Sequence, residues 1–461
     1  MDTLRSVENP SPALAAPPRL KRKASSLGLA WRLHKNAVGA WSDDDYREEF
    51  FARRLLFRKV FVANSPAAAK HVLLDRAENY VKSFIARQLL KPLGQGLLNT
   101  EGAVWRHQRR TMAPAFHPRR VEAFVPAMAQ ATRDMLSSWE EHPPGVAIDI
   151  AEEMAQLTLD IITRTMFSSD LRDRAGEVRT ALLRYQRFGG RPSIADLLGL
   201  PPWIPRLHAR EVRDATATLD EIIYEIIAKR RRDGGPADDL LGLLLAARDE
   251  ETGEGMDDAE LRDQIATIFT AGHETTANAL TWTWYLLSQH PWADERLCSE
   301  LAHRLCGRAP TVGDLPHLTY ARMVLEESMR LYPPAHTMSR QALEDDEIAG
   351  HKIPKGAAVL VSPWLLHRHE KLWTQPKLFD PERFAPSRAE TRPRYAYLPF
   401  GGGPRICIGA SFAMQEAIII LAMVAQRYRL RLQPGHGIEP IGLITLRPRD
   451  GLPMVLERRS A

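Results

Sequence analysis

The chain has 461 residues, of which 44% are hydrophobic and 26% are charged, a composition typical of a soluble globular protein with a large core. The 62 basic and 57 acidic side chains leave a formal charge of +5, an excess too small to indicate nucleic-acid binding. Three cysteines, Cys298, Cys306 and Cys407, are too few for a disulfide scaffold and lack zinc-site spacing. This cysteine usage favours a reducing, cytoplasmic location.

The first segment, residues 1–25, is rich in Pro, Ala and Ser and predicts a flexible tail. It lacks the apolar core of a secretory signal, and no other run approaches the ~20 apolar residues of a membrane span. We therefore expect no membrane anchor. Residues 26–461 show neither an internal repeat nor a break in composition, so we expect one large domain there.

Apolar residues recur three and four positions apart through most of the chain, which predicts helices over 151–167, 210–232 and 291–307 among others. Strand signals gather in one late block at 345–363, and a second, weaker pair of strands is expected at 444–456. The sequence thus predicts a mainly α protein with small sheets.

A long central helix is predicted over 256–291. It opens with Asp257 and Glu260 at capping-box spacing and closes at Pro291, which gives about 30 residues and a length of about 45 Å. Its middle is apolar on nearly all faces, as expected of a helix that crosses the core.

The centre of this helix carries a polar interruption, AGHETT, that ends at Thr276. Gly272 costs about 1 kcal/mol in a helix interior, and the carboxylate of Glu274 is costly to bury without a partner. Broken local rules are expected at functional sites, but a kink with threonines bonded back to carbonyls explains them too. His273 alone indicates a supporting or surface residue rather than a ligand.

Cys407 lies in a glycine-rich stretch, FGGGPRICIG, directly before an apolar helix that is predicted to start almost at the cysteine. The positive end of that helix favours a thiolate, and the glycines at 401–403 and 409 allow backbone or a flat ligand to approach closely. These features describe a sulfur anion held against a planar cationic group such as haem iron. A buried structural cysteine is the other interpretation of the residues alone.

The stretch resembles the haem-thiolate loop of the cytochrome P450 family, whose pattern is Phe-Gly-x-Gly-x-Arg-x-Cys-x-Gly. Six specified residues at fixed spacing agree. The resemblance runs from about residue 60 to the C-terminus and includes four further motifs in family order. These are WRHQR (105–109), AGHETT (271–276), EESMRLYPP (326–334) and PERF (381–384).

The resemblance implies a single large cytochrome P450 fold that binds haem b, iron protoporphyrin IX, with Cys407 as the ligand of the iron. It places Phe400 and Gly409 against the porphyrin. Positions that meet the two haem carboxylates in the family correspond here to Trp105, Arg109, Arg340 and Arg405, with His336 and His107 as further candidates. It gives Glu327, Arg330 and Arg383 a structural role that holds the haem-bearing core together.

On the oxygen side, the resemblance implies that Gly272 leaves room for dioxygen, that Thr275 holds bound oxygen by hydrogen bonding and that Glu274 relays protons. The implied reaction inserts one oxygen atom into a lipophilic small molecule by hydroxylation or epoxidation. The alternatives are a peroxide-using or hydroperoxide-rearranging haem-thiolate enzyme, and a haem-binding sensor or carrier. The Glu274–Thr275 pair argues against the peroxide chemistry, which needs no proton relay to oxygen.

The sequence contains no flavin or iron–sulfur segment, so electrons are expected from a separate ferredoxin or flavodoxin and its reductase. A basic patch that includes Arg106 and Arg110 is the expected docking surface. By analogy with the family, the substrate contacts lie at 80–98, 180–200, 265–276, 335–338 and 442–445, and their apolar composition predicts a lipophilic substrate.

Overall fold

The computed structural model describes residues 14–168, 174–189, 208–235 and 237–459. The helices are α1 (Ser26–Lys35), α2 (Pro66–Lys70), α3 (Phe84–Leu90), α4 (Gly102–Met112), α5 (Pro118–Val121), α6 (Val125–Glu140), α7 (Ile150–Phe167), α8 (Ala175–Gly189), α10 (Ala209–Asp233), α11 (Leu240–Ala246), α12 (Asp258–Gln289), α13 (Pro291–Leu305), α14 (Thr319–Leu331), α15 (Pro363–Leu366), α16 (Pro386–Ala389) and α17 (Ala410–Arg427). The strands are β1 (Phe50–Leu55), β2 (Arg58–Ala63), β3 (Tyr80–Lys82), β4 (Ala147–Asp149), β5 (Met338–Ala342), β6 (Asp346–Ile348), β7 (His351–Ile353), β8 (Ala358–Val361), β9 (Tyr428–Leu432), β10 (Pro440–Gly442), β11 (Leu446–Pro448) and β12 (Pro453–Arg458). The predicted mainly α class with small sheets is confirmed, and so are the helices expected at 151–167, 210–232 and 291–307.

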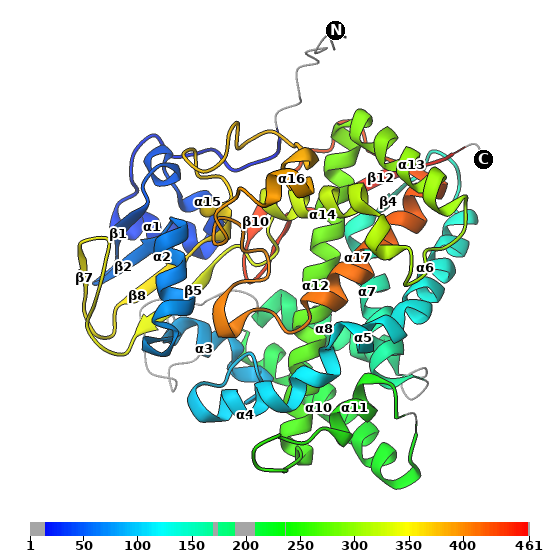
Figure 1. The fold of residues 1–461 in the computed structure, drawn as a ribbon, viewed down its shortest axis with the longest axis horizontal. Coiled ribbons are helices and arrows are strands. Elements are labelled where there is room, and N and C mark those ends of the chain that lie inside the picture. Colours follow the sequence, from blue (N-terminus) through cyan, green and yellow to red (C-terminus); the bar gives the residue numbers. More distant parts are fainter. Residues whose placement is uncertain (1–13, 169–173, 190–207, 236, 460–461) are drawn as a thin grey trace, which may run out of the picture.

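Helix α12 runs through the middle of the molecule, with the largest sheet on one side and most other helices on the other (Figure 1). The side chain of Asp257 caps it by accepting a hydrogen bond from the N–H of Glu260 at 2.8 Å. Pro291 then starts α13, so the predicted central helix is confirmed. Trp282 and Leu286 are fully buried on α12, and each such side chain contributes about 1.5–3 kcal/mol to the free energy of folding. Among the described helices, none is long and apolar enough to span a membrane.

The largest sheet has five strands in the order β1-β2-β8-β5-β3. Strands β2 and β8 are parallel, with Val60 opposite Ala358, and the other neighbours are antiparallel. Strands β6, β7 and β8 lie within 345–363, as predicted, but the sequence did not predict the β1–β2 hairpin. Its strands carry Arg53, Arg54 and Lys59 among their apolar residues, which weakens the strand signal in the sequence.

The pair of strands expected at 444–456 is confirmed, but the two strands are not paired with each other. Strands β11 and β12 both form there, but β11 pairs with β10, and β12 pairs with β4 and β9. Asp149, at the end of β4, accepts a hydrogen bond from the N–H of Leu452 at 2.8 Å, and this long-range contact draws β12 away from β11.

The described part of the predicted tail, residues 14–25, contacts the body of the protein. The N–H of Ala15 donates to the hydroxyl of Tyr285 at 3.0 Å, and the hydroxyl of Tyr332 donates to the carbonyl of Ala15 at 2.8 Å. Arg19 forms an ion pair with Glu370 at 2.7 Å. The segment 14–25 is therefore packed in place, and a single domain over 26–461 stays a prediction.

Candidate active site

Cys407 lies in the loop that leads into α17, three residues before that helix begins. Its backbone N–H donates to the carbonyl of Phe400 at 2.9 Å, which closes the loop, and its side chain is exposed. The surrounding protein is dense enough that burial raises the pKa of the Cys407 thiol, while the N–H of Gly409 and the charge of Arg109 act in the opposite direction. The sulfur thus faces the positive end of a helix, where a metal cation would hold it as a thiolate.

Two glycines shape the space around this sulfur. Gly403 has a φ of 68°, and a Cβ on it would lie 1.7 Å from the carbonyl oxygen of Leu73, so only glycine lets the loop close on that backbone. Gly409 has room for a side chain, with the sulfur of Cys407 as the nearest atom at 4.0 Å. The absence of a side chain at Gly409 therefore leaves open space beside the sulfur.

A cluster of cations lies close to this loop and contains Lys82, Arg340 and Arg405, which we call the cation cluster. Lys82 is directly opposite Arg340 in the β3–β5 ladder. One carboxylate, Glu101 just before α4, lies near all three: it pairs with Arg405, its distance to the ammonium of Lys82 is 3.8 Å, and its charge acts on Arg340. The guanidinium of Arg405 also lies 4.3 Å from the centre of the Trp105 ring.

The pKa values of the cation cluster reflect burial and this shortage of negative charge. Burial, with help from Arg405, lowers the pKa of Lys82 to about 7, and the same two causes lower that of Arg340 to about 10. Glu101 opposes both shifts without cancelling them. Cations in this state are favourable partners for two additional carboxylates.

The structure therefore fits haem, a flat group with two carboxylates and a metal that takes a thiolate. Of the predicted carboxylate-binding residues, Trp105, Arg340 and Arg405 lie together, and Arg109, one turn beyond Trp105 on α4, carries the charge that acts on Cys407. Lys82 and Glu101 were not predicted. Glu101 stands next to the WRHQR motif and could have been suspected, whereas no pattern in the sequence singles out Lys82.

The two candidate histidines are engaged elsewhere. His107 lies 3.0 Å from the carboxylate of Asp249, and the Nε2 of His336 lies 2.8 Å from the carbonyl of Leu443. Burial lowers the pKa of His336, so this side chain is neutral. Neither ring contacts the cation cluster in the described part of the chain.

On α12, the polar interruption is held by a hydrogen-bond chain. The hydroxyl of Thr445 donates to the carboxylate of Glu274 at 2.6 Å and accepts from the amide of Asn278 at 3.2 Å. The hydroxyl of Thr275 donates to the carbonyl of Ala271 at 2.8 Å, as one of the sequence interpretations expected. Thr445, which follows α12 by more than 150 residues, is a positioning residue for Glu274 that sequence reasoning missed.

The helix continues without interruption through Gly272 and His273. A Cβ on Gly272 would lie 2.5 Å from the side chain of Ile162, so this glycine lets α7 pack closely against α12. His273 is buried, and its Nδ1 lies 2.6 Å from the carbonyl of Phe269. Room for dioxygen beside Gly272 stays a prediction.

Helix α17 meets α12 beside this cluster. Glu416, nine residues after Cys407, is buried, and burial raises its pKa well above the usual range despite a hydrogen bond with Thr276. A buried carboxyl group with a raised pKa thus lies next to the predicted oxygen-activating residues. An acid inside the apolar stretch 412–425 was the signal in the sequence that could have identified it.

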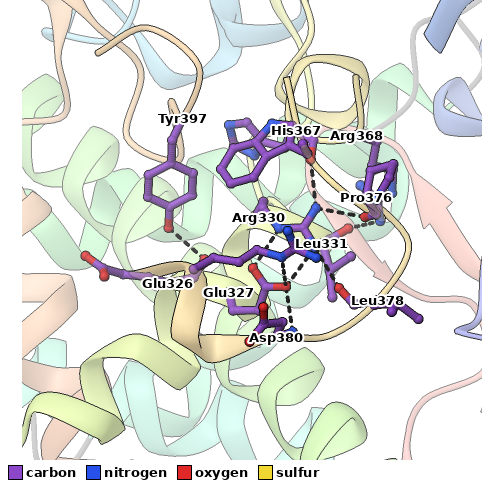
Figure 2. Close-up of polar contacts among 12 residues, drawn as sticks. Glu326, Glu327, Arg330, Leu331, His367, Arg368, Pro376, Leu378, Asp380 and Tyr397 are labelled. Carbon is purple, nitrogen blue, oxygen red and sulfur yellow. Dashed lines mark hydrogen bonds and ion pairs between the residues drawn. The ribbon is translucent and has the colours of Figure 1, made fainter. Parts of the chain in front are cut away.

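The third group of predicted residues is centred on Glu327 and Arg330, which are fully buried between α14 and the loop after α15 (Figure 2). Arg330 forms a bidentate pair with Glu327, with distances of 2.6 and 2.7 Å, and Arg383 approaches the same carboxylate at 3.4 Å. The remaining N–H groups of Arg330 donate at 2.8–2.9 Å to the backbone carbonyls of His367, Pro376 and Leu378.

This group is connected to the cysteine loop through His367. The Nε2 of His367 accepts a hydrogen bond from the backbone N–H of Leu398 at 2.8 Å, two residues before Phe400. The structure thus brings Glu327, Arg330 and Arg383 together and ties them to the start of the loop that carries Cys407.

Comparison with known proteins identifies the family. The family model described as Cytochrome P450 matches residues 41–449. The chain belongs to the cytochrome P450 family. It is 39% identical to cyclooctatin synthase and 38% identical to cyclooctat-9-en-7-ol 5-monooxygenase, both from Streptomyces melanosporofaciens, over 84% and 87% of this chain and 84% and 86% of the relatives.

A plant relative and a solved structure agree with this assignment. The cytokinin hydroxylase of Arabidopsis thaliana is 34% identical over 82% of this chain and 74% of its own length. The crystal structure of the cytochrome P450DA heme domain superposes with a TM-score of 0.83 at 28% identity and covers 97% of this chain and 98% of that domain. The predicted fold and reaction class are confirmed: the chain is a cytochrome P450 monooxygenase, an oxygen-incorporating oxidoreductase of a haem-binding family.

Proposed function

We propose that this monooxygenase holds haem b through the thiolate of Cys407 and the cation cluster, and that it oxidises a lipophilic small molecule. The observation that carries the proposal is the sharing of one carboxylate, Glu101, by Lys82, Arg340 and Arg405 beside an exposed thiol at a helix N-terminus. When bound, a thiolate-ligated haem supplies iron chemistry that favours cleavage of the O–O bond.

The residues of this chain have separable tasks in the proposal. The cation cluster, Trp105 and Arg109 neutralise and orient the two haem carboxylates, and Phe400 flanks the ring. Gly409 leaves the space that a flat group needs beside the sulfur.

On the opposite side, Glu274 and Thr275 handle protons. One carboxylate oxygen of Glu274 is fixed by Thr445, which leaves the second oxygen of this half-buried group to exchange protons with solvent. The hydroxyl oxygen of Thr275 donates its proton to Ala271 and keeps its lone pairs available to accept a hydrogen bond.

Electrons come, in this proposal, from a ferredoxin or flavodoxin with its reductase. Arg106 on α4 and Arg119 and Arg120 on α5 are exposed, and α5 packs against α17, so they present positive charge on the side of the cysteine loop. Arg110, also expected in this patch, is occupied by Asp249 and Glu251 at 3.1 and 3.0 Å. A cytoplasmic location stays a prediction.

The lipophilic substrate is supported by the names of relatives, one of which is a monooxygenase of cyclooctat-9-en-7-ol, and by the apolar residues of the predicted contact segments. Of these segments, 190–200 lies outside the described residues.

The test uses the purified haem-loaded protein. The reduced carbon monoxide complex should show the absorption band of thiolate ligation, and the band should be lost in Cys407→Ser. Turnover of a fluorogenic lipophilic ether with a surrogate ferredoxin and reductase should then form product in the wild type. Thr275→Ala should keep consuming reductant, release peroxide and lose about tenfold in product per reductant, because the positioned hydroxyl that accepts this hydrogen bond is lost.

A matched control is Thr283→Ala. Thr283 lies on the same helix and also donates to a backbone carbonyl, that of Ala279 at 2.7 Å, but it is far along α12 from Glu274. Its loss should leave the product yield unchanged. An unchanged yield in Thr275→Ala would remove Thr275 from the proposal, and turnover that needs peroxide but no electron donor would favour the peroxide-using alternative.

A further inference from the structure

A cavity of about 610 Å³ lies on one face of the five-stranded sheet, outside the residues already assigned to the cofactor. Helix α1 forms the opposite wall with Leu29 and Leu33, and α3 closes one side with Phe84 and Leu89. The lining is therefore mostly hydrocarbon, and a ligand in this space buries apolar surface.

The strand register explains which side chains form the sheet side of this cavity. In β2, alternate residues Arg58, Val60 and Val62 share the cavity face, and in the neighbouring β8 their partners Ala358 and Leu360 do the same. Because β2 and β8 are parallel, their first residues lie at one end of the cavity and their last residues lie at the other.

The charges of the lining are of one sign. Among the described residues that line the cavity, four are cationic, namely Arg53, Arg58, Lys59 and Lys355, and none is acidic. Arg53 is neutralised by Asp45, and the ammonium of Lys59 lies over the Phe61 ring at 4.8 Å, on the other face of β2.

Arg58 and Lys355 are left without such partners. Both are exposed, and within the described part of the chain neither forms an ion pair. Arg58 begins β2, and Lys355 lies three residues before β8, so both lie at the same end of the cavity. This end is cationic.

The opposite end has no charge and adjoins the cofactor site. There the cavity is lined by Ser339, His336 and Leu443, and burial lowers the pKa of His336 and keeps it neutral. Ser339 is followed in β5 by Arg340 of the cation cluster, and Leu443 lies two residues before Thr445, which holds Glu274. From Arg58 to Val62 the strand rises about 13 Å, so the cavity leads from exposed cations towards the oxidising centre.

We propose that this cavity binds an amphiphile with one anionic head group, a carboxylate or a phosphate on an alkyl chain. The head group lies against Arg58 and Lys355. The alkyl chain lies along the face of the sheet, and its far end is directed to the site of oxidation. The inference deepens the proposed function, because it names the class of substrate that this site takes. The alkyl chain supplies most of the affinity because its apolar surface is removed from water on binding. The two cations set the orientation of the ligand.

The test is calorimetric titration of the haem-loaded protein with decanoate, decyl phosphate, decan-1-ol and decyltrimethylammonium, all below their micelle concentrations. We expect the anions to bind about tenfold more tightly than the alcohol and the cation to bind most weakly, with an anion preference that shrinks as salt is added. The tighter of the two anions identifies whether the head group is of the fatty-acid or the phospholipid type.

The double variant Arg58→Gln with Lys355→Gln should weaken decanoate binding about fivefold to tenfold and leave decan-1-ol binding unchanged. The matched control is Arg54→Gln with Lys352→Gln, which removes the same charge from exposed residues that do not line the cavity. This control should keep the anion preference.

Equal binding of decanoate and decan-1-ol, or an anion preference that survives in the Arg58/Lys355 double variant, would overturn the inference. The outcome is separable from that of the proposed function. A thiolate-type carbon monoxide spectrum without anion preference contradicts the amphiphile alone, whereas anion preference without that spectrum contradicts the haem-thiolate site alone.

Discussion

Arg330 uses all five of its N–H donors inside the protein, whereas the side chain of Arg340 makes one hydrogen bond, to the carbonyl of Ser339 at 3.2 Å, within the described part of the chain. Both side chains belong to groups with one carboxylate, Glu327 in the first and Glu101 in the second. In the first group, backbone carbonyls complete the remaining bonds. In the second, the cations lack enough hydrogen-bond acceptors and negative charge, and burial and mutual repulsion lower the pKa values of Lys82 and Arg340.

The difference separates a structural group from a binding group. A buried ion pair with every donor satisfied has nothing to offer a ligand, and removing one member leaves a buried charge. A cluster with more cations than carboxylates costs free energy until an anion arrives, so it is prepared for one. Three measurements test whether the two groups differ in this way.

The largest effect is expected at Glu327. Glu327→Gln leaves Arg330 buried without its carboxylate, which should lower the free energy of unfolding by about 3–5 kcal/mol, measured by urea denaturation. Glu457→Gln, which breaks the exposed pair with Arg431, is the control and should cost at most about 1 kcal/mol. A loss at Glu327 no larger than the control would show that the buried pair is not the structural element inferred here.

At Arg340 a smaller effect is expected, on the rate of haem loss rather than on the free energy of unfolding. Arg340→Gln removes a poorly paired cation, so the haem-free protein should be as stable as the wild type or more so. Haem should nevertheless leave about tenfold faster, because one charge-assisted hydrogen bond is lost. Haem transfer to an excess of a haem-scavenging apoprotein measures this rate, and unchanged transfer would contradict a role of Arg340 towards the haem carboxylates.

The smallest effect concerns pH and Lys82. Its pKa of about 7 in the folded protein lies below the value of about 10.4 in an unfolded chain. Between these values the unfolded chain holds a proton that the folded protein has lost, so stability rises with pH. The haem-free wild type should therefore gain about 1 kcal/mol over Lys82→Met between pH 7.5 and 8.5, by urea denaturation at each pH. Parallel profiles for the two proteins would contradict the lowered pKa.

Local signals made much of this architecture predictable. The central helix was predictable from the caps and apolar faces of 256–291, and α17 was predictable from the apolar run after Cys407. Both predictions depend on residues that are close in sequence. The spacing of the family motifs brought Glu327, Arg330 and Arg383 into one group before the structure did.

Contacts between residues far apart in the sequence could not be predicted from such local signals. Lys82 meets Arg340 only because β3 pairs with β5, more than 250 residues later, and Glu274 meets Thr445 only through the return of the chain after α17. Neither partner carries a local pattern that distinguishes it from an ordinary surface lysine or threonine. The β1–β2 hairpin was missed for a related reason, since its stability depends on β8 and on the cover that α1 provides.

The packing of residues 14–25 has a consequence for the order in which the chain can fold. The backbone of Ala15 is bonded to Tyr285 and Tyr332, which lie 270 and 317 residues further along. During synthesis on the ribosome, this early segment must wait until more than two thirds of the chain has emerged before it can find both partners. The first described residues of the protein therefore complete these native contacts long after they have been synthesised.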